Sequence, residues 1–488
     1  MRRATQWLVA IWASVAAGDA LAFDYREAIG YTRLQQALGK RLPDGAGLHV
    51  AQVEAPLRSD PGFWHLASAG SWWPDATDEE FEHKRFAYVS AKGDGAHSGH
   101  ASGVGRLFYG RESSIAPGIT RIDLYNATEW INTVLRSGSV FYPGQMSARV
   151  VNHSWVGSTG SPVYDSELLR RLDWSVNADR SLHVVGISNG EDSPALLGNA
   201  FNVIPVGRSD GHHGTSTVAV DSVYREGRSL PLLVAPFETA SSATPVVAAA
   251  AALLVQSAHR YPTFSQSSVR TLEGEVLYDA ERPEVIKAIL MAGADRVASN
   301  DDGTSVSDYR GSLDRRTDNG LDRRYGAGQL NVLNSYAILS GGEQRSSEDS
   351  PKRRAAVAWY GFDFDSDFGG AGGSNALATY RFTADSSRRW LTATLAWNVT
   401  ITTSGDTFEA NVLLHDLDLE LYDEADDRPV AVSASWSQNT ESLWLPLTSG
   451  HSYRLVVRAA GEGEAPFQWR YALAWRIDAG QTAINVSD

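Results

Sequence analysis

Hydroxyl groups cluster where a polar stretch of the chain meets a long apolar run. Ser241, Ser242 and Thr244 lie directly before Pro245, which is followed by ten apolar residues, Val246 to Val255. Because proline is favoured in the first turn of a helix, we expect Ser241 just outside a buried helix. The N-terminus of that helix stabilises developing negative charge, as a serine nucleophile requires. An ordinary capped core helix has the same pattern and is the alternative.

Three further stretches supply residue types that acyl transfer also needs. "GAHSGHASGVG" places His97 and His100 three residues apart in a glycine-rich segment, "LHVVGISNGED" ends an apolar strand at Asn189, and "LHVAQVEAP" ends one at Glu54. A histidine acts as a base, an amide can donate to an oxyanion, and a carboxylate orients a histidine. Each stretch also has an ordinary explanation when taken singly. The histidine segment could be a solvated loop or a His-x-x-His metal site, the Asn189 stretch an Asn-Gly turn, and Glu54 a surface residue.

The order of these motifs resembles that of the subtilisin-like serine protease (subtilase) superfamily, over about residues 45 to 340. The family's histidine motif, His-Gly-Thr-His-Val-Ala-Gly, corresponds to the run from His97 to Gly103. This resemblance implies that His97 is the catalytic base and that His100 is structural. The family's serine motif, Gly-Thr-Ser-Met-Ala-Thr-Pro, corresponds to the run from Thr239 to Pro245 and implies that Ser241 is the nucleophile.

Two more segments follow the family's pattern, and three positions depart from it. The strand end "GISN" implies that Asn189 is the oxyanion donor, and "VVNHSWVG" resembles the substrate-binding strand. The residues it would present to an extended peptide are Ser154, Trp155 and Val156. The departures are Glu54 in place of the usual aspartate, Ala240 in place of a threonine, and Val156 in place of a glycine. A glutamate can hold an imidazole if the backbone absorbs its extra methylene group.

The resemblance implies an exported serine endopeptidase with a Ser241-His97-Glu54 triad, acting on a protein or peptide substrate. The departures leave open a second function: a catalytically weakened scaffold that binds peptide or a cell-surface polymer. A carbohydrate hydrolase would need a pair of carboxylates near these motifs, and the sequence offers none there.

The elements that would position these residues indicate an α/β domain over residues 23–340. Apolar strand-like runs such as "SARVVNHSW" and "FNVIPVG" alternate with helical patterns such as "SELLRRLDWSVNADRS" and "PEVIKAILMAGA". This alternation predicts a layered α/β domain, and the resemblance implies that it has the three layers and the mainly parallel central sheet of subtilisin. The polar segment 341–354 is predicted to be a linker. Beyond it the apolar residues alternate with period two, as in Leu417, Leu419 and Leu421, so residues 355–488 are predicted to form an antiparallel, jelly-roll-like β-sandwich.

Composition excludes several classes of protein. The 488 residues carry a net charge of −15, which disfavours a nucleic-acid partner, and they include no cysteine, which excludes thiol catalysis and cysteine metal sites. Residues 1–22 resemble a cleavable secretory signal, which predicts a secreted or periplasmic protein. The run from Val246 to Val255 is about half the length that spans a bilayer, so no membrane span is expected after cleavage.

No cofactor is expected to be needed for the chemistry, and the sequence makes no prediction of oligomeric state. Carboxylates in the C-terminal part could hold a structural Ca²⁺ ion through hard oxygen ligands, although solvated turns are the favoured explanation. These weak candidates are Asp363, Asp365, Asp367, Asp416 and Asp418.

Overall fold

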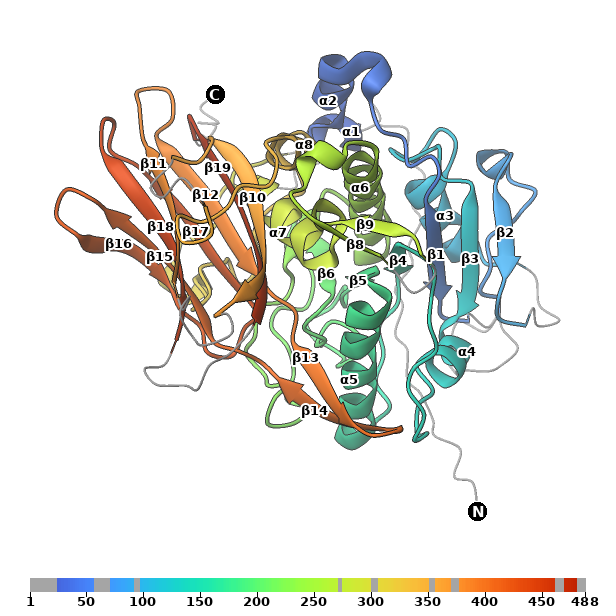
Figure 1. The fold of residues 1–488 in the computed structure, drawn as a ribbon. Helices are drawn as coiled ribbons and strands as arrows, with labels where there is room; N and C mark the ends of the chain where they lie inside the picture. The colour runs from blue at the N-terminus through green and yellow to red at the C-terminus, as the bar shows by residue number, and fades with distance from the viewer. Residues whose placement is uncertain are drawn as a thin grey trace.

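A computed structural model describes eight segments of the chain. They comprise residues 24–56, 71–91, 97–270, 274–299, 306–350, 356–369, 377–460 and 469–480. The predicted signal segment, residues 1–22, lies outside the described residues. The predicted mixture of a parallel α/β domain and an antiparallel β-sandwich is confirmed (Figure 1).

A seven-stranded sheet in the order β2-β3-β1-β4-β5-β6-β7 forms the centre of the first domain. All neighbouring pairs in it are parallel. In chain order the strands are β1 (His49–Glu54), β2 (Arg85–Tyr88), β3 (Arg121–Asn126), β4 (Val150–His153), β5 (Leu182–Gly186), β6 (Ile204–Arg208) and β7 (Leu233–Ala235). β4, β5 and β7 are buried along their whole length, as expected for strands with helices on both faces.

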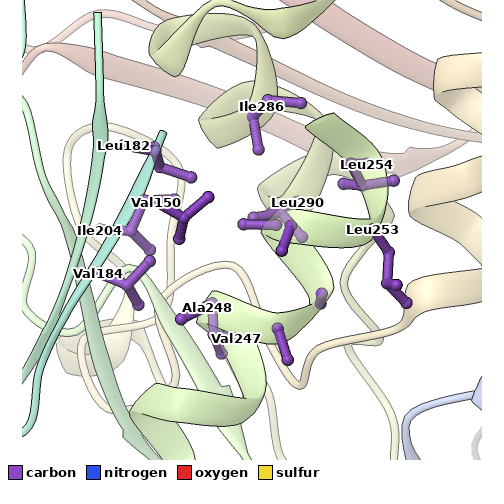
Figure 2. Packing of buried hydrophobic residues seen from close by; sticks show 14 of the residues in the cluster. Val150, Leu182, Val184, Ile204, Val247, Ala248, Leu253, Leu254, Ile286 and Leu290 are labelled. Carbon is purple, nitrogen blue, oxygen red and sulfur yellow. The ribbon is translucent and has the colours of Figure 1, made fainter. Parts of the chain in front are cut away.

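Helices cover both faces of this sheet. In β4, Val150 packs in one core cluster with α6 (Ala240–Arg260), whereas its neighbour Val151 packs in another with α5 (Pro162–Asp179). Because successive side chains of a strand point to opposite faces, α6 and α5 lie on opposite sides of the sheet. Figure 2 shows the α6 side of this core, where strand valines, leucines and isoleucines meet Val247 and Ala248.

The remaining helices are short or lie at the edges of the domain. They are α1 (Tyr25–Ala28), α2 (Tyr31–Leu38), α3 (Gly99–Tyr109), α4 (Ala127–Glu129), α7 (Pro283–Gly293) and α8 (Val332–Ser340). A π-helical turn spans Trp130–Val134, and 3₁₀ turns span Gly39–Arg41, Glu79–Phe81, Pro262–Phe264, Asp279–Glu281 and Leu313–Arg315. A small hairpin joins β8 (Ser268–Arg270) to β9 (Val276–Tyr278).

Helix α6 is longer than the apolar run that predicts it. Its 21 residues are enough, by length and composition alone, to cross a membrane, and it is the one such helix in the part of the chain that the structure describes. However, 83% of its most apolar window is buried inside the molecule, against β4, β5, β6 and α3. The helix is therefore built as the central core helix of the domain. Its run of alanines lets the neighbouring elements approach it closely.

Two four-stranded antiparallel sheets form the C-terminal sandwich. One has the order β10-β19-β12-β17 and the other β11-β18-β15-β16. The strands are β10 (Tyr360–Phe368), β11 (Leu377–Thr383), β12 (Trp390–Ala396), β15 (Leu417–Asp423), β16 (Arg428–Ser433), β17 (Thr440–Pro446), β18 (Ser452–Ala459) and β19 (Trp469–Asp478). The predicted apolar face of β15 points into the sandwich core, together with tryptophans 397, 469 and 475. These tryptophans fill the core, as strand tryptophans usually do.

The first of these sheets also packs on the α/β domain. Helix α7 lies against β19 and β12, and Ala396, Ala472 and Ala474 belong to the same core cluster as α6. From Leu391 onward β12 is therefore buried on both faces, which the period-two pattern did not predict. A long hairpin, β13 (Thr400–Ser404) and β14 (Thr407–Leu413), extends from the sandwich and packs on α5 (Figure 1).

The described part of the predicted linker is tied to the sandwich. The backbone N–H of Gln344 donates to the carbonyl of Phe362, and that of Ser347 donates to the carbonyl of Thr379, at 2.7 and 2.8 Å. Residues 351–355 lie outside the described residues. The polar residues of this segment therefore reflect its exposure to solvent, and they do not mean that it lacks contacts with the sandwich.

Candidate active site

The predicted acid, Glu54, is the last residue of β1 and is almost completely buried, with 2% of its side chain exposed. The strand positions it by pairing with β3 on one side and β4 on the other. Its Oε2 atom lies 3.0 Å from Nδ1 of His100, the second residue of α3. A carboxylate accepts and cannot donate, so this contact assigns the proton to Nδ1 and leaves Nε2 as the basic nitrogen.

The predicted contact between Glu54 and His97 is wrong, because His100 occupies that place. Ser98 caps α3 by accepting a hydrogen bond from Ala101, so the helix begins after His97. His97 therefore lies ahead of the helix, with half of its side chain exposed, and its Nε2 lies 3.4 Å from Asp75. His100, with 10% of its side chain exposed, lies on the first turn, which faces β1. The histidine predicted to be structural is thus the one placed against the acid.

The predicted nucleophile, Ser241, is the second residue of α6 and not a residue outside it. Thr239 is the N-cap, and its side chain accepts from the backbone N–H of Ser242 at 3.1 Å. Pro245 consequently lies inside the helix, one turn later than the sequence predicts. Ser241 still lies where the first backbone N–H groups of the helix have no intrahelical partner.

Pro245 has a local consequence that ties the serine to the sheet. A proline has no N–H, so it cannot donate to the carbonyl of Ser241 four residues earlier. That carbonyl instead accepts from the Ser154 hydroxyl at 3.1 Å, and the Ser241 hydroxyl lies 3.4 Å from the carbonyl of Ser154. The start of α6 is thereby tied to the residue that follows β4.

A cavity of about 140 Å³ opens beside Ser241. It is lined by all three residues predicted to contact substrate, Ser154, Trp155 and Val156, and by Gly186 at the end of β5. Residues that follow this strand complete the lining: Ile187, Ser188, Asn189, Gly190, Glu191, Asp192 and Pro194. Asn189, predicted to be the oxyanion donor, accepts from the backbone N–H of Ala240 through Oδ1 at 2.7 Å. This contact orients the amide and leaves Nδ2 as its donor group, beside Ser241.

Among the described residues, the His100 imidazole and the Ser241 hydroxyl do not form a hydrogen bond with each other. The Nε2 atom of His100 is buried and has no hydrogen-bond partner among the described residues. Hydrogen bonds between catalytic groups are often long in unliganded enzymes and tighten when substrate binds. His100 is not among the described residues that line the cavity beside Ser241, although α3 and α6, which carry the two side chains, pack against each other.

The weak calcium candidates lie on or next to β10 and β15 of the sandwich. In the described part of the chain, no group of three or more histidine or acidic side chains is placed to hold a metal ion. Asp363 is buried and accepts from the Tyr380 hydroxyl at 2.6 Å, and burial raises its pKa well above the usual value. Asp365 accepts from the backbone N–H of Asp367 at 2.9 Å, where the pairing of β10 with β19 shifts register. Burial also raises the pKa of Asp418 to about 6.

Two buried residues that the motifs do not reveal also belong to this site. Gln52, on the same face of β1 as Glu54, donates to Glu54, and Tyr109, at the end of α3, donates to Gln52. The period-two pattern of β1 could have identified Gln52 as a polar residue facing the same way as Glu54. Nothing local in the sequence indicates Tyr109.

Comparison with known proteins gives one family match. The Subtilase family matches residues 89–328, just under half of the chain. This region includes His97, His100, Asn189 and Ser241, whereas Glu54 lies outside it. With the parallel seven-stranded sheet and its flanking helices, the match gives this part of the chain the subtilisin-like fold. The comparison with curated proteins gave no match.

Solved structures of proteases resemble the chain at low identity. The self-cleaved protease domain of PatA is 18% identical, over 62% of this chain and 100% of that one, with a TM-score of 0.38. A cold-adapted subtilisin-like serine proteinase is 17% identical, over 60% and 90%, with a TM-score of 0.35. A protease from Pseudoalteromonas arctica PAMC 21717 is 16% identical, over 64% and 96%, with a TM-score of 0.34. At these values the structures carry no conclusion about activity or substrate.

Proposed function

We propose that the chain is an exported serine endopeptidase with a Ser241-His100-Glu54 triad. The observation that carries the proposal is the buried contact between Glu54 and Nδ1 of His100, which leaves Nε2 buried and without a partner. The subtilase-family match over residues 89–328 and the cavity that Ser241 and Asn189 share support the same conclusion.

In the proposed reaction, Ser241 attacks the peptide carbonyl while Nε2 of His100 takes its proton. The proton then passes to the leaving amine, the acyl-enzyme forms, and water regenerates the serine by the same route in reverse. Glu54 holds the imidazole in the tautomer with Nδ1 protonated and stabilises the imidazolium that forms. The Nδ2 group of Asn189 and the backbone N–H of Ser241 donate to the oxyanion.

The substrate proposed is a protein or peptide that lies along Ser154, Trp155 and Val156. No step of this mechanism needs a cofactor, because the charge that develops is stabilised by hydrogen bonds of the chain itself. Export is proposed from the signal-like residues 1–22, which lie outside the described residues.

A peptide-library digest tests the proposal. The purified chain should cleave internal peptide bonds, and Ser241→Ala should abolish this cleavage. Ser242→Ala is a matched control at the next residue of the same helix turn and should retain most of it. Cleavage that survives Ser241→Ala, or a chain that cleaves no member of the library, would refute the proposed activity.

The alternative is a scaffold that binds peptide without turning it over. It is favoured by Val156, which lines the cavity where the family has a glycine, and by the Ser241 hydroxyl, which points to the Ser154 carbonyl. The same digest separates the two functions, because a scaffold would retain library peptides and release them uncut.

A further inference from the structure

We propose that Gln52 and Tyr109 form a buried hydrogen-bonded relay that positions Glu54 against His100, and that this relay is fitted to glutamate rather than aspartate. The inference rests on the proposed function for its effect on turnover, although the relay itself is a property of the fold. Gln52 and Tyr109 are positioning residues in this proposal, since Gln52 acts through Glu54 and Tyr109 acts through Gln52.

Gln52 lies two residues before Glu54 on β1, so both side chains leave the same face of the strand. Its Nε2 group donates to Oε1 of Glu54 at 2.9 Å and to the backbone carbonyl of Ala101 at 2.9 Å. Ala101 follows His100 in α3. One amide therefore links the strand that carries the acid to the helix turn that carries the histidine.

The orientation of this amide is fixed by its neighbours. Both groups facing Nε2, the Glu54 carboxylate and the Ala101 carbonyl, are acceptors, so only the NH₂ side can meet them. Oε1 then faces the Tyr109 hydroxyl, which donates to it. A flipped amide would turn its oxygen towards the buried carboxylate, so that neither the Glu54 oxygen nor the amide oxygen would have a donor there. Unpaired buried polar groups destabilise a folded protein, so the network favours one arrangement.

Tyr109 reaches Gln52 because α3 leaves room for its ring. The side chain folds back over Gly105, where an added Cβ would lie 2.6 Å from the Tyr109 hydroxyl. Burial, with a contribution from the charge of Glu54, raises the pKa of Tyr109 well above its usual value. The hydroxyl therefore stays protonated and remains a donor throughout the pH range in which a peptidase would work.

The relay also explains why the acid here is longer than in the family. Glu54 must accept from Gln52 through one oxygen and hold His100 through the other. An aspartate would withdraw the carboxylate by about one carbon–carbon bond, roughly 1.5 Å. The backbone cannot follow, because β1 pairs with both β3 and β4. We therefore expect Glu54→Asp to lose both contacts rather than restore a more ordinary triad.

Three substitutions and one control test the relay by kinetics. Gln52→Met removes the amide at similar volume, and Tyr109→Phe removes only the hydroxyl. Each should lower kcat about 10- to 100-fold with KM little changed, as a misplaced catalytic group does. Glu54→Asp should lower kcat at least as far. The control is Tyr25→Phe, which removes another largely buried donor hydroxyl, bound to the carbonyl of Ser113, and should leave kcat unchanged.

A readout that is independent of turnover keeps the inference testable if the chain proves inactive. The downfield proton resonance of the Nδ1–H group of His100 reports its hydrogen bond to Glu54. We expect it to shift or broaden in Gln52→Met and Tyr109→Phe and to be unchanged in Tyr25→Phe. An unaltered resonance in both folded relay variants, or full turnover of Glu54→Asp, would overturn the relay. A chain that shows the expected resonance changes but cleaves nothing would instead overturn the proposed function.

Discussion

The contact of His100, rather than His97, with Glu54 makes a sharp prediction for a pair of alanine substitutions. His100→Ala removes the imidazole that Glu54 holds and should lower kcat/KM by about 10⁴-fold or more, as loss of a triad base does. His97→Ala removes a half-exposed side chain 3.4 Å from Asp75. Exposed ion pairs contribute less than about 1 kcal/mol, so the fold should be little affected and kcat/KM should stay within about twofold.

The assay is hydrolysis of one peptide that the unaltered chain cleaves, measured for both variants at neutral pH. Circular dichroism and thermal unfolding of each variant establish that both are folded. The reasoning is refuted if His97→Ala loses activity while His100→Ala retains it. That outcome would restore the family-based assignment and leave the contact between Glu54 and His100 without a catalytic role.

Three further predictions concern the oxyanion donor, the hairpin of the sandwich and a buried carboxylate. Asn189→Asp keeps an acceptor for the Ala240 N–H but loses the Nδ2 donor, so kcat should fall at least 100-fold in the same peptide assay. A smaller decrease would mean that Asn189 does not donate to the oxyanion. Phe408, on β14, packs on Tyr142, Trp174 and the Arg171 guanidinium. Phe408→Ala should therefore lower the free energy of unfolding by about 3 kcal/mol, measured with denaturant. A decrease below about 1 kcal/mol would show that the hairpin is not anchored there. Burial raises the pKa of Glu343 to about 7, so the folded state keeps a proton that the unfolded chain loses above about 4.5, and stability should fall as pH rises between these values. Glu343→Gln should flatten the dependence of the urea unfolding midpoint on pH, and an unchanged dependence would contradict this prediction.

Much of the fold could be predicted because its strands and helices have strong local signals. The apolar runs that became β1, β4, β5 and β6 have the composition of strands covered on both faces, and the alanine run predicted the central helix α6. The sandwich strand β15 followed its period-two pattern. The burial of β12 on both faces could not be predicted, since it depends on α7, which lies far away in the sequence.

The site was predicted in its residue types but not in its pairing. Ser154, Asn189 and Ser241 all line one cavity, as their motifs suggested. The predicted contact between Glu54 and His97 was wrong because His97 and His100 are separated by less than one helical turn. The start of α3 is set by Ser98, whose hydroxyl accepts a hydrogen bond from the backbone N–H of Ala101. The comparison of motifs did not take this cap into account. The relay could not be predicted, because Tyr109 meets Gln52 from 57 positions away.

The most direct test of the proposed triad is to map the adduct of a fluorophosphonate probe by peptide mass spectrometry. In the folded chain we predict a single adduct on Ser241, formed rapidly, and its loss in both His100→Ala and Ser241→Ala but not in His97→Ala. An adduct on another serine, no adduct at all, or labelling that persists without His100 would contradict the account.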